Sequence, residues 1–497
     1  MKYYFFLFLL VRVSGFLKLP LGSPFSIKNI EYKHKISTDH LSEADLAIVQ
    51  GISGVYGLIG PDFVGNDVEN LYQLFTGNGI IQGCFFDKGE VTFVNHYVRT
   101  EKLIYEEQCG QVLKHKYLYL LFFLLNKIHC LPNVLGFANT ALVNMGKKHY
   151  ALYERDVPYE ILFDFDNKSI TTGQKQHIHG LNFFSAHPVI YDDKVETIQY
   201  NVFRKTVSFL QLTTDLVVQK HIETPMTYLP VVHDFISTRY NYIVFDSPLA
   251  FKFSDIFTKK IPISLMENKP TFIRIVNKFT GRVRTFEIPK GVYVFHFAQV
   301  YEDEHVIRIL APCYDVLDFS TVDIQGKFRL LVLDKVSGKV SIKKHHRLEN
   351  LNLDFPVRYE DKIILRNIHN RVCNGFVVCR DLEIVHEIYF FQRFVCGEPR
   401  VIYLKGSPYL IFFTFNISSQ REQGQRGEAP QQLTSKVALP PENFGQRGEA
   451  PQQLNSKSAT RAENFGHIVV LNLRDFTHID LPIDFAVQFG FHSFFFT

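Results

Sequence analysis

The sequence lacks the motifs of several common enzyme and metal-binding classes. It contains no C-x-x-C pair with the spacing of a zinc site, no Walker A motif, no G-x-S-x-G and no H-E-x-x-H. The glycine-rich run GNGIIQG, at 77–83, does not have the spacing of a dinucleotide-binding loop. These absences argue against zinc fingers, P-loop nucleotide hydrolases, nucleophile-elbow hydrolases and zinc proteases of that motif.

Tryptophan is also absent, and no apolar run reaches the roughly 18 uncharged residues that a membrane-spanning helix needs. The seven cysteines are an odd number, which favours a reduced compartment. An apolar stretch opens the chain, but Arg12 interrupts it and no small-residue cleavage site follows. We interpret residues 1–24 as a signal or an arm, and we favour the cytoplasm over secretion.

Acidic and basic residues are interspersed and nearly balanced, with 54 Lys and Arg against 50 Asp and Glu. This balance gives no indication of a nucleic-acid partner, and none is expected. The 497 residues include 48 phenylalanines, and 46% of the chain is hydrophobic. The chain can therefore bury a large core, and its phenylalanines suit either that core or an apolar ligand tunnel.

Most of the chain reads as short strands with period-two alternation and tight turns. The hairpins IRIVNKFTGRVRTF (273–286) and LLVLDKVSGKVSI (330–342) resemble each other, and their turn motifs begin 57 residues apart. FFDKGEVTFV and LNLRDFTHIDL are weaker relatives of the same pattern. Recurrent antiparallel units at this spacing predict the blades of an all-β propeller.

Four histidines lie in apolar, strand-like surroundings: His187, His233, His296 and His492. A buried imidazole needs a hydrogen-bond partner or a metal, because an unpaired buried polar group costs about 1–3 kcal/mol. The first three are separated by 46 and 63 residues, so each is expected in a different blade. Inner strands converge on a propeller axis, where such histidines can meet. An all-imidazole site suits Fe, Cu, Ni or Zn.

Two segments interrupt the strand pattern. Residues 101–136 include KYLYLLFFLLNKIHCLP, which we interpret either as a buried helix or as a helix that dips into one membrane leaflet. On the second interpretation Leu118, Leu121, Phe122 and Phe123 dock on the membrane surface. Residues 417–466 carry GQRGEAPQQL and ENFG twice each, with a period of 21. This polar segment predicts a disordered repeat insertion in the last blade.

Several motifs, in order, resemble those of the carotenoid cleavage oxygenase family, which includes the retinoid isomerase of the pigment epithelium. They are GPDF, FTGNGIIQGCFFDKGEVTFVNHYVRTEKL, ANTALV, HYALYERDVPYEI, SAHP, VHDFISTRYNYIVFDSPL, FHFAQVYED, GEP and GFHS. The resemblance implies one seven-bladed β-propeller over residues 25–497, with an iron ion on its axis. It also implies a cap of loops and helices over one face, to which residues 101–136 would belong.

The resemblance assigns the four histidines as the ligands of Fe(II). It further implies carboxylates that hold three of these histidines from behind, namely Glu154, Asp354 and Glu398. At 354 the family usually has glutamate, so a contact through water or a shifted strand is expected there. Other departures are Leu58, Ile59 and Thr76, at positions where the family has Arg, Asn and an acidic residue.

From this resemblance we predict an Fe(II)-dependent dioxygenase that cleaves a conjugated carbon–carbon double bond of a carotenoid or apocarotenoid to two carbonyl products. Its expected partners are an apolar polyene, O2 and a membrane surface, which makes it a peripheral membrane protein of the cytoplasm. Three alternatives remain open: an isomerohydrolase acting on retinyl esters, a stilbene-cleaving dioxygenase, and a degenerate propeller that only binds.

Overall fold

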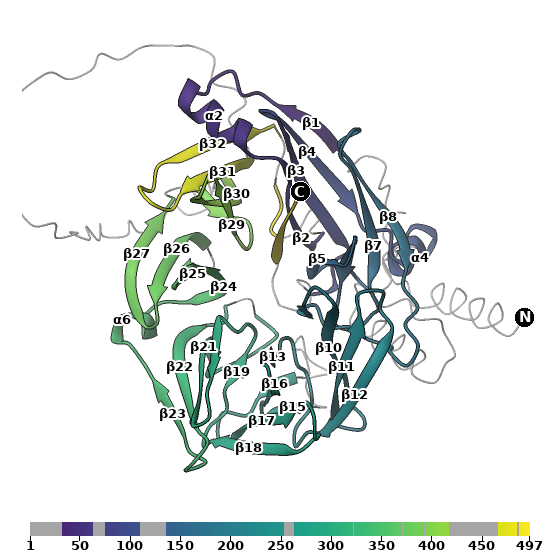
Figure 1. Ribbon diagram of the computed structural model, residues 1–497, viewed down its shortest axis with the longest axis vertical. Coiled ribbons are helices and arrows are strands. Elements are labelled where there is room, and N and C mark those ends of the chain that lie inside the picture. Colours follow the sequence, from purple (N-terminus) through teal and green to yellow (C-terminus); the bar gives the residue numbers. More distant parts are fainter. Residues whose placement is uncertain are drawn as a thin grey trace, which may run out of the picture.

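The computed structural model describes residues 32–62, 75–109, 136–252, 263–321, 323–369, 372–390, 393–416, 466–484 and 487–497. Within these residues the strands form a two-stranded sheet and seven larger antiparallel sheets. The seven larger sheets surround a common axis, which confirms the predicted seven-bladed β-propeller (Figure 1). Helices are few and short: α2 (Glu43–Gly51), α4 (Glu101–Cys109) and α6 (His346–Glu349). Among the described residues, no helix is both long enough and apolar enough to cross a membrane.

We number the blades in chain order and give their strands from the axis outward. Blade 1 contains β33 (His492–Phe496), β2 (Gly54–Pro61), β3 (Gly79–Asp87), β4 (Glu90–Tyr97) and β1 (Tyr32–Ile36). Blade 2 contains β5 (Ala141–Met145), β6 (Lys148–Leu152), β7 (Tyr159–Asp164) and β8 (Ser169–Lys175). Blade 3 contains β9 (Val189–Ile190), β10 (Lys194–Asn201), β11 (Thr206–Thr213) and β12 (Val218–Pro225).

Blade 4 contains β13 (Ile236–Ser237), β14 (Asn241–Asp246), β17 (Thr271–Asn277) and β18 (Val283–Ile288). The chain between β14 and β17 forms a separate two-stranded sheet of β15 (Leu249–Phe251) and β16 (Ile263–Leu265). Blade 5 contains β19 (Tyr293–Val294), β20 (Gln299–Glu302), β21 (Val306–Tyr314), β22 (Lys327–Asp334) and β23 (Val340–Lys343). Blade 6 contains β24 (Leu353–Tyr359), β25 (Lys362–His369), β26 (Val372–Arg380) and β27 (Glu383–Tyr389). Blade 7 contains β28 (Arg393–Val395), β29 (Arg400–Leu404), β30 (Ser407–Asn416), β31 (Gly466–Asn472) and β32 (His478–Ile483).

The ring closes through the C-terminal strand. β33 lies beside β2, with His492 opposite Ile59 and Phe496 opposite Val55 in the antiparallel register. Blade 1 therefore combines strands from both ends of the described chain, as the purple and yellow segments near the C label show (Figure 1). This pairing fixes where His492 reaches the axis, and a buried cluster shared with blade 7 packs against the other side of blade 1.

Period-two alternation produces the core. On β14, Tyr242 and Val244 face a buried cluster shared with blade 3, whereas Ile243 and Phe245 face a cluster shared with blade 5. The described residues form seven clusters of this kind, each between two neighbouring blades. Because each blade buries both of its faces, the apolar surface removed from water stabilises the ring as a whole.

The two related turn motifs connect the two outer strands of neighbouring blades, β17–β18 and β22–β23. Asn277 and Asp334 start the turns, and each side chain accepts hydrogen bonds from backbone N–H groups two and three residues later. Gly281 and Gly338 have φ values of +70° and +73°, a backbone conformation that glycine adopts without steric cost. The repeat read from the sequence is therefore a repeat of turn chemistry.

The lysine after each turn-starting residue folds back toward a glutamate. Lys278 Nζ lies 2.7 Å from Oε2 of Glu196 on β10, and Lys335 Nζ lies 2.6 Å from Oε1 of Glu302 on β20. Glu302 also accepts a hydrogen bond from Asn241 of blade 4. These two ion pairs, called the lysine–glutamate pairs below, therefore help to hold blades 3, 4 and 5 together.

The predicted insertion lies between β30 and β31. Its last residue, Gly466, is the first residue of β31 and lies opposite Phe415 in the sheet, so that boundary of the prediction is wrong by one residue. The remaining residues, 417–465, lie outside the described residues. So do residues 1–24 and the four predicted membrane-docking residues, Leu118, Leu121, Phe122 and Phe123. Of the predicted segment 101–136, the structure describes α4 and residue 136.

Candidate metal centre

Each of the four predicted histidines lies on the innermost part of a different blade. His187 precedes β9 of blade 3, and His233 precedes β13 of blade 4. His296 lies between β19 and β20 of blade 5, and His492 is the first residue of β33 in blade 1. Since inner strands approach the axis most closely, residues far apart in the sequence come together there.

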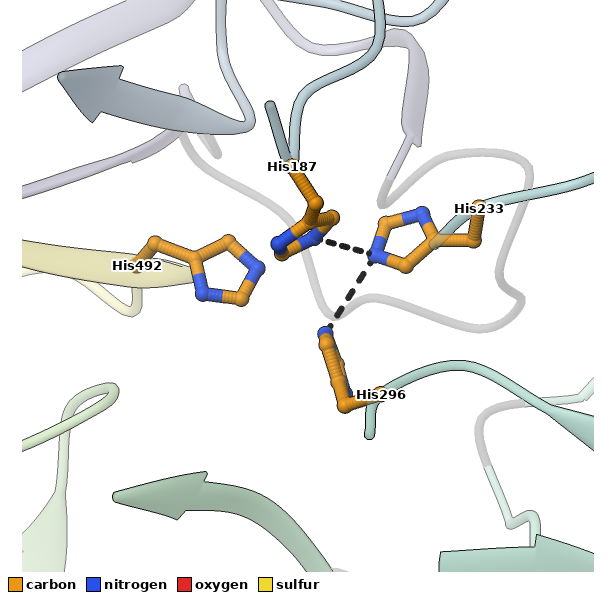
Figure 2. A group of neighbouring side chains, drawn as sticks. All are labelled: His187, His233, His296 and His492. Atoms are coloured by element: carbon orange, nitrogen blue, oxygen red, sulfur yellow. Dashed lines mark hydrogen bonds between the residues drawn. The ribbon is translucent and has the colours of Figure 1, made fainter. Parts of the chain in front are cut away.

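The four side chains point toward one another and their rings surround a common centre (Figure 2). One nitrogen from each ring can be chosen so that all four lie within 4.8 Å of one another. Nε2 of His233 is 2.9 Å from Nε2 of His187 and 3.3 Å from Nε2 of His296. All four side chains are buried or half-buried, so water screens them poorly.

The three predicted carboxylates lie behind three of the imidazoles. Oε1 of Glu154 is 2.6 Å from Nδ1 of His233, and Oδ1 of Asp354 is 2.8 Å from Nδ1 of His296. Oε2 of Glu398 is 3.4 Å from Nδ1 of His492, a longer contact, and accepts a hydrogen bond from the backbone N–H of Ser493. Such contacts fix the orientation and tautomer of an imidazole and raise its basicity as a ligand.

These carboxylates come from the three blades that supply no histidine. Glu154 follows β6 of blade 2, Asp354 lies on β24 of blade 6, and Glu398 lies between β28 and β29 of blade 7. Every blade therefore contributes one residue to the constellation. A seven-residue arrangement of this kind depends on the whole ring, so the fold and the site are built together.

The electrostatics favour ionised carboxylates and a neutral His187. Burial opposes ionisation of Glu154, Asp354 and Glu398, but the neighbouring histidines outweigh it and lower the pKa of all three. Burial, followed by the charges of the other three histidines, places the pKa of His187 well below its usual value. His187 is therefore neutral at neutral pH, as a metal ligand must be.

Asp354 reaches His296 directly, which answers the expectation of a water-mediated contact or a shifted strand. The register of β24 against β25 shifts between Asp354 and Val357, and Phe355 has φ of +54°. The strand is therefore irregular directly after Asp354, and the carboxylate contacts the imidazole without an intervening group. The contact is therefore direct at 2.8 Å, and the shifted strand stays a prediction.

One carboxylate next to the site was not assigned a role from the sequence. Oδ1 of Asp234 accepts a hydrogen bond from the backbone N–H of Phe235, and Oδ2 accepts one from the backbone N–H of Phe297. Asp234 therefore ties the segment that carries His233 to the segment that carries His296. Its place directly after a candidate ligand, in the motif VHDF, was the signal that could have identified it.

The donor set fits a divalent metal ion. His233 and His296 direct Nδ1 at carboxylates, so a ring that carries its one proton on Nδ1 presents a lone pair at Nε2. The two Nε2 atoms lie 3.3 Å apart. Facing lone pairs repel unless a proton or a cation lies between them. Two nitrogens that bind one ion at right angles, with bonds of about 2.1 Å, lie about 3 Å apart. Four imidazoles without a thiolate suit Fe, Cu, Ni or Zn.

A cavity of about 720 Å³ adjoins this centre along the inner strands. Its walls include His187, His492 and residues of the inner strands β9, β13, β20 and β33. Leu142, Val300 and Phe496 supply apolar surface. The charged residues of the lining are Asp234, Arg358, Glu398 and Arg400. Two of the four histidines, His187 and His492, therefore open onto this cavity.

The fold and the site together define a β-propeller with a four-histidine centre on its axis. The family model described as retinal pigment epithelial membrane protein matches residues 47–369. The chain therefore belongs to the family of that protein and the carotenoid cleavage oxygenases, as the sequence motifs predicted.

Two curated relatives illustrate the similarity. Carotenoid 9,10(9',10')-cleavage dioxygenase 1 of Arabidopsis thaliana is 27% identical over 314 residues, which cover 59% of this chain and 55% of the relative. Carotenoid cleavage oxygenase 1 of Neurospora crassa is 26% identical over 345 residues, which cover 62% of this chain and 60% of the relative. The chain thus spans little more than half the length of the curated relatives that it matches.

Solved structures share the fold over nearly the whole chain. The cobalt-substituted apocarotenoid oxygenase of Synechocystis superposes with a TM-score of 0.69 at 16% identity, covering 94% of this chain and 96% of that chain. The lignostilbene dioxygenase of Pseudomonas brassicacearum superposes with a TM-score of 0.68 at 16% identity, covering 94% and 95%. At these identities the likeness establishes the architecture.

Proposed function

We propose that this protein is an Fe(II)-dependent dioxygenase that cleaves a conjugated carbon–carbon double bond of a carotenoid or apocarotenoid to two carbonyl products. The observation that carries this proposal is the convergence of His187, His233, His296 and His492 at one centre. Membership of the family and the cleavage activities named for the curated relatives support the substrate class. The intact set of histidines and carboxylates also argues against a degenerate propeller that only binds.

The chain's own residues have holding and positioning roles in this proposal. The four histidines would hold the iron, and the carboxylates behind three of them keep each Nδ1 protonated and each Nε2 free to bind. The chemistry that iron supplies when bound is the activation of O2. The proposed reaction needs no general base, because double-bond cleavage by O2 transfers no proton from the polyene.

Apolar rings next to the ligands suit such a reaction. The ring of Phe355 lies 4.8 Å from that of His296 and 5.4 Å from that of His492, measured between centroids. Phe295 lies 5.6 Å from His233 in an edge-to-face arrangement. These rings limit the access of water to the ligands and present an apolar surface that is compatible with a polyene.

We further propose that the protein works in the cytoplasm as a peripheral membrane protein. The support is chemical: a very apolar polyene resides in membranes, and the segment around Leu121 has apolar residues with flanking lysines. Replacing Leu121, Phe122 and Phe123 by Ser should move the protein from the liposome pellet to the supernatant. Unchanged pelleting of a folded variant would contradict membrane docking through these residues.

Labelled oxygen tests the reaction. The protein is reconstituted with Fe(II) and given a panel of carotenoids, apocarotenoids, stilbenes and retinyl esters under ¹⁸O2, and the products are separated and weighed by mass spectrometry. Cleavage of a polyene with ¹⁸O in both carbonyl products supports the proposal. Label-free retinol from a retinyl ester would instead identify an isomerohydrolase, and cleavage of stilbenes alone would identify a different substrate class. Iron binding without turnover of any substrate would favour a binding module.

A further inference from the structure

Asp354 receives a second side-chain donor in addition to His296. The hydroxyl of Tyr314, at the end of β21 in blade 5, donates a hydrogen bond to Oδ2 of Asp354 at 2.5 Å. The other oxygen, Oδ1, accepts hydrogen bonds from Nδ1 of His296 and from the backbone N–H of Phe355, both at 2.8 Å. Tyr314 and Asp354 are 2% and 5% exposed, so neither group can exchange its partner for bulk water.

The other two carboxylates are held differently. Among the described residues, the side chain that donates to Glu154 is His233, and Glu398 is approached by His492 and by one backbone N–H group. Both glutamates are also less buried, with side chains 14% exposed against 7% for Asp354. A phenol behind the carboxylate is thus a feature of the one position where the chain has Asp in place of the family's usual Glu.

The surrounding structure makes room for this phenol. A Cβ atom on Gly326 would lie 3.0 Å from the hydroxyl oxygen of Tyr314 and 2.4 Å from the backbone oxygen of Leu353. Glycine at 326 therefore allows β24 and the tyrosine to approach each other closely. The ring of Tyr314 packs edge-to-face against Phe295, with centroids 5.1 Å apart, so its orientation is fixed independently of the hydrogen bond.

We infer that Tyr314 is a positioning residue for His296: its hydroxyl holds Asp354, and the shorter carboxylate can then direct Nδ1 of the imidazole. Without this hydroxyl, Oδ2 of a buried carboxylate would lose its donor and Asp354 could rotate away from His296. The inference rests on the proposed metal centre, because it concerns how one ligand of that centre is oriented.

The structure also makes Tyr314 and Asp354 interdependent. An additional methylene at 354 would push the carboxylate toward a hydroxyl that already lies 2.5 Å from Oδ2. Asp354→Glu alone should therefore disturb the contact to His296, although it restores the residue that the family usually has. Removal of the hydroxyl in the double variant Asp354→Glu, Tyr314→Phe opens the space that the longer side chain needs.

Cobalt(II) titration of the metal-free protein tests the inference without reference to turnover. Tyr314→Phe should weaken Co(II) binding by about 10-fold and change the visible ligand-field absorption of the bound ion. Asp354→Glu should weaken binding as well, and the double variant should recover most of the loss. Tyr159→Phe is the matched control, because Tyr159 is also a buried phenol that donates to a buried aspartate, Asp156, at 3.3 Å in blade 2. It should leave affinity and spectrum unchanged.

The possible outcomes separate the claims. If Tyr314→Phe keeps wild-type affinity and spectrum, Tyr314 serves only packing and the inference is wrong. If the double variant binds no better than Asp354→Glu, the proposed interdependence is wrong. If the wild-type protein binds neither Co(II) nor Fe(II), the proposed metal centre fails, and the role of Tyr314 falls with it. A change in melting temperature without a change in Co(II) affinity would likewise overturn the inference.

Discussion

The axial histidine cluster and the lysine–glutamate pairs are both polar, and both are built from buried or half-buried side chains. They differ in whether each polar group has a partner of opposite charge within the protein. Lys278 and Glu196 place opposite charges 2.7 Å apart, so each group finds its partner inside the protein. At the axis the carboxylates occupy one nitrogen of three imidazoles, while the remaining nitrogens face one another. The Lys278–Glu196 pair joins blades 3 and 4, whereas the histidine cluster offers imidazole nitrogens to an ion that we propose is iron.

Removal of one imidazole from the axial histidine cluster should have the largest effect on the amount of bound iron. His233→Ala and His492→Ala should each reduce bound iron to background, because a missing ligand also leaves Glu154 or Glu398 without its partner. His467→Ala is the control, since His467 is a half-buried histidine of β31 outside the cluster. Metal content is measured after anaerobic reconstitution with Fe(II). Retention of wild-type iron by both axial variants would refute the ligand assignment.

Removal of a lysine from the lysine–glutamate pairs should have the opposite effect: it should lower stability and leave metal binding unchanged. Lys278→Met leaves the fully buried Glu196 without its closest cation, and breaking a buried ion pair typically costs about 3–5 kcal/mol. Urea unfolding should show this loss, while Co(II) affinity stays at the wild-type value. Lys335→Met should cost less, because its side chain is 20% exposed. A fall in Co(II) affinity on Lys278→Met would show that the two regions are coupled.

The carboxylates behind the histidines should have an intermediate effect. Glu154→Gln should weaken metal binding by about 10–100-fold, since the glutamine carries no charge to support the imidazole. The effect of Glu398→Gln should be smaller, because its contact to His492 is 3.4 Å against 2.6 Å for Glu154 and His233. Co(II) titration of the two variants side by side measures the difference. Equal affinities for both variants and the wild type would show that these carboxylates do not support the ligands.

Acid should destabilise the metal-free protein because His187, in the axial cluster, resists protonation in the folded state. Burial and the other histidines place the pKa of His187 well below its usual value, so the unfolded chain binds a proton that the folded chain excludes. This contribution to stability is present above the usual histidine pKa of about 6.5 and is lost as the pH falls below it. Urea unfolding from pH 7 to pH 5 should show the decline, and His187→Asn should make it shallower. Identical slopes for the two proteins would contradict the assignment to His187.

The smallest effect is expected from the repeat segment. Because Phe415 and Gly466 lie opposite each other in the sheet, a short connection can join β30 to β31. Loop length changes stability by only about 0.6 kcal/mol per doubling. Deletion of residues 420–464 should therefore leave iron binding and the lysine–glutamate pairs intact, with protease sensitivity of the wild-type segment as a companion measurement. Loss of iron in the deletion variant would show that the segment orders blade 7.

The hairpins of this fold can be predicted from the sequence, whereas the strand pairing that completes blade 1 cannot. The 57-residue repeat corresponds to equivalent hairpins in blades 4 and 5 because its turns depend on local residues, Asn277 and Asp334, and on their glycines. The weaker relatives are likewise the hairpins β3–β4 and β31–β32. The pairing of β33 with β2 joins the two ends of the chain and leaves no local signal.

The residues of the site likewise fall into those that the sequence predicts and those that it does not. His187, His233, His296 and His492 could be selected because each lies in an apolar, strand-like run, and the family motifs supplied the carboxylates. Tyr314 could not be selected, since it reaches Asp354 from another blade and its own sequence neighbourhood is that of an ordinary strand end. The direct contact of Asp354 could not be predicted from side-chain length alone, because β24 has a register irregularity directly after this residue that leaves no sequence signal.

X-ray absorption at the iron edge of the reconstituted wild-type protein tests most directly whether the axial cluster is a metal site. The proposal predicts one iron per chain, with the multiple scattering of four imidazoles and no sulfur neighbour. Iron that is absent after anaerobic reconstitution, or that is bound through sulfur or carboxylate with fewer imidazoles, would contradict it.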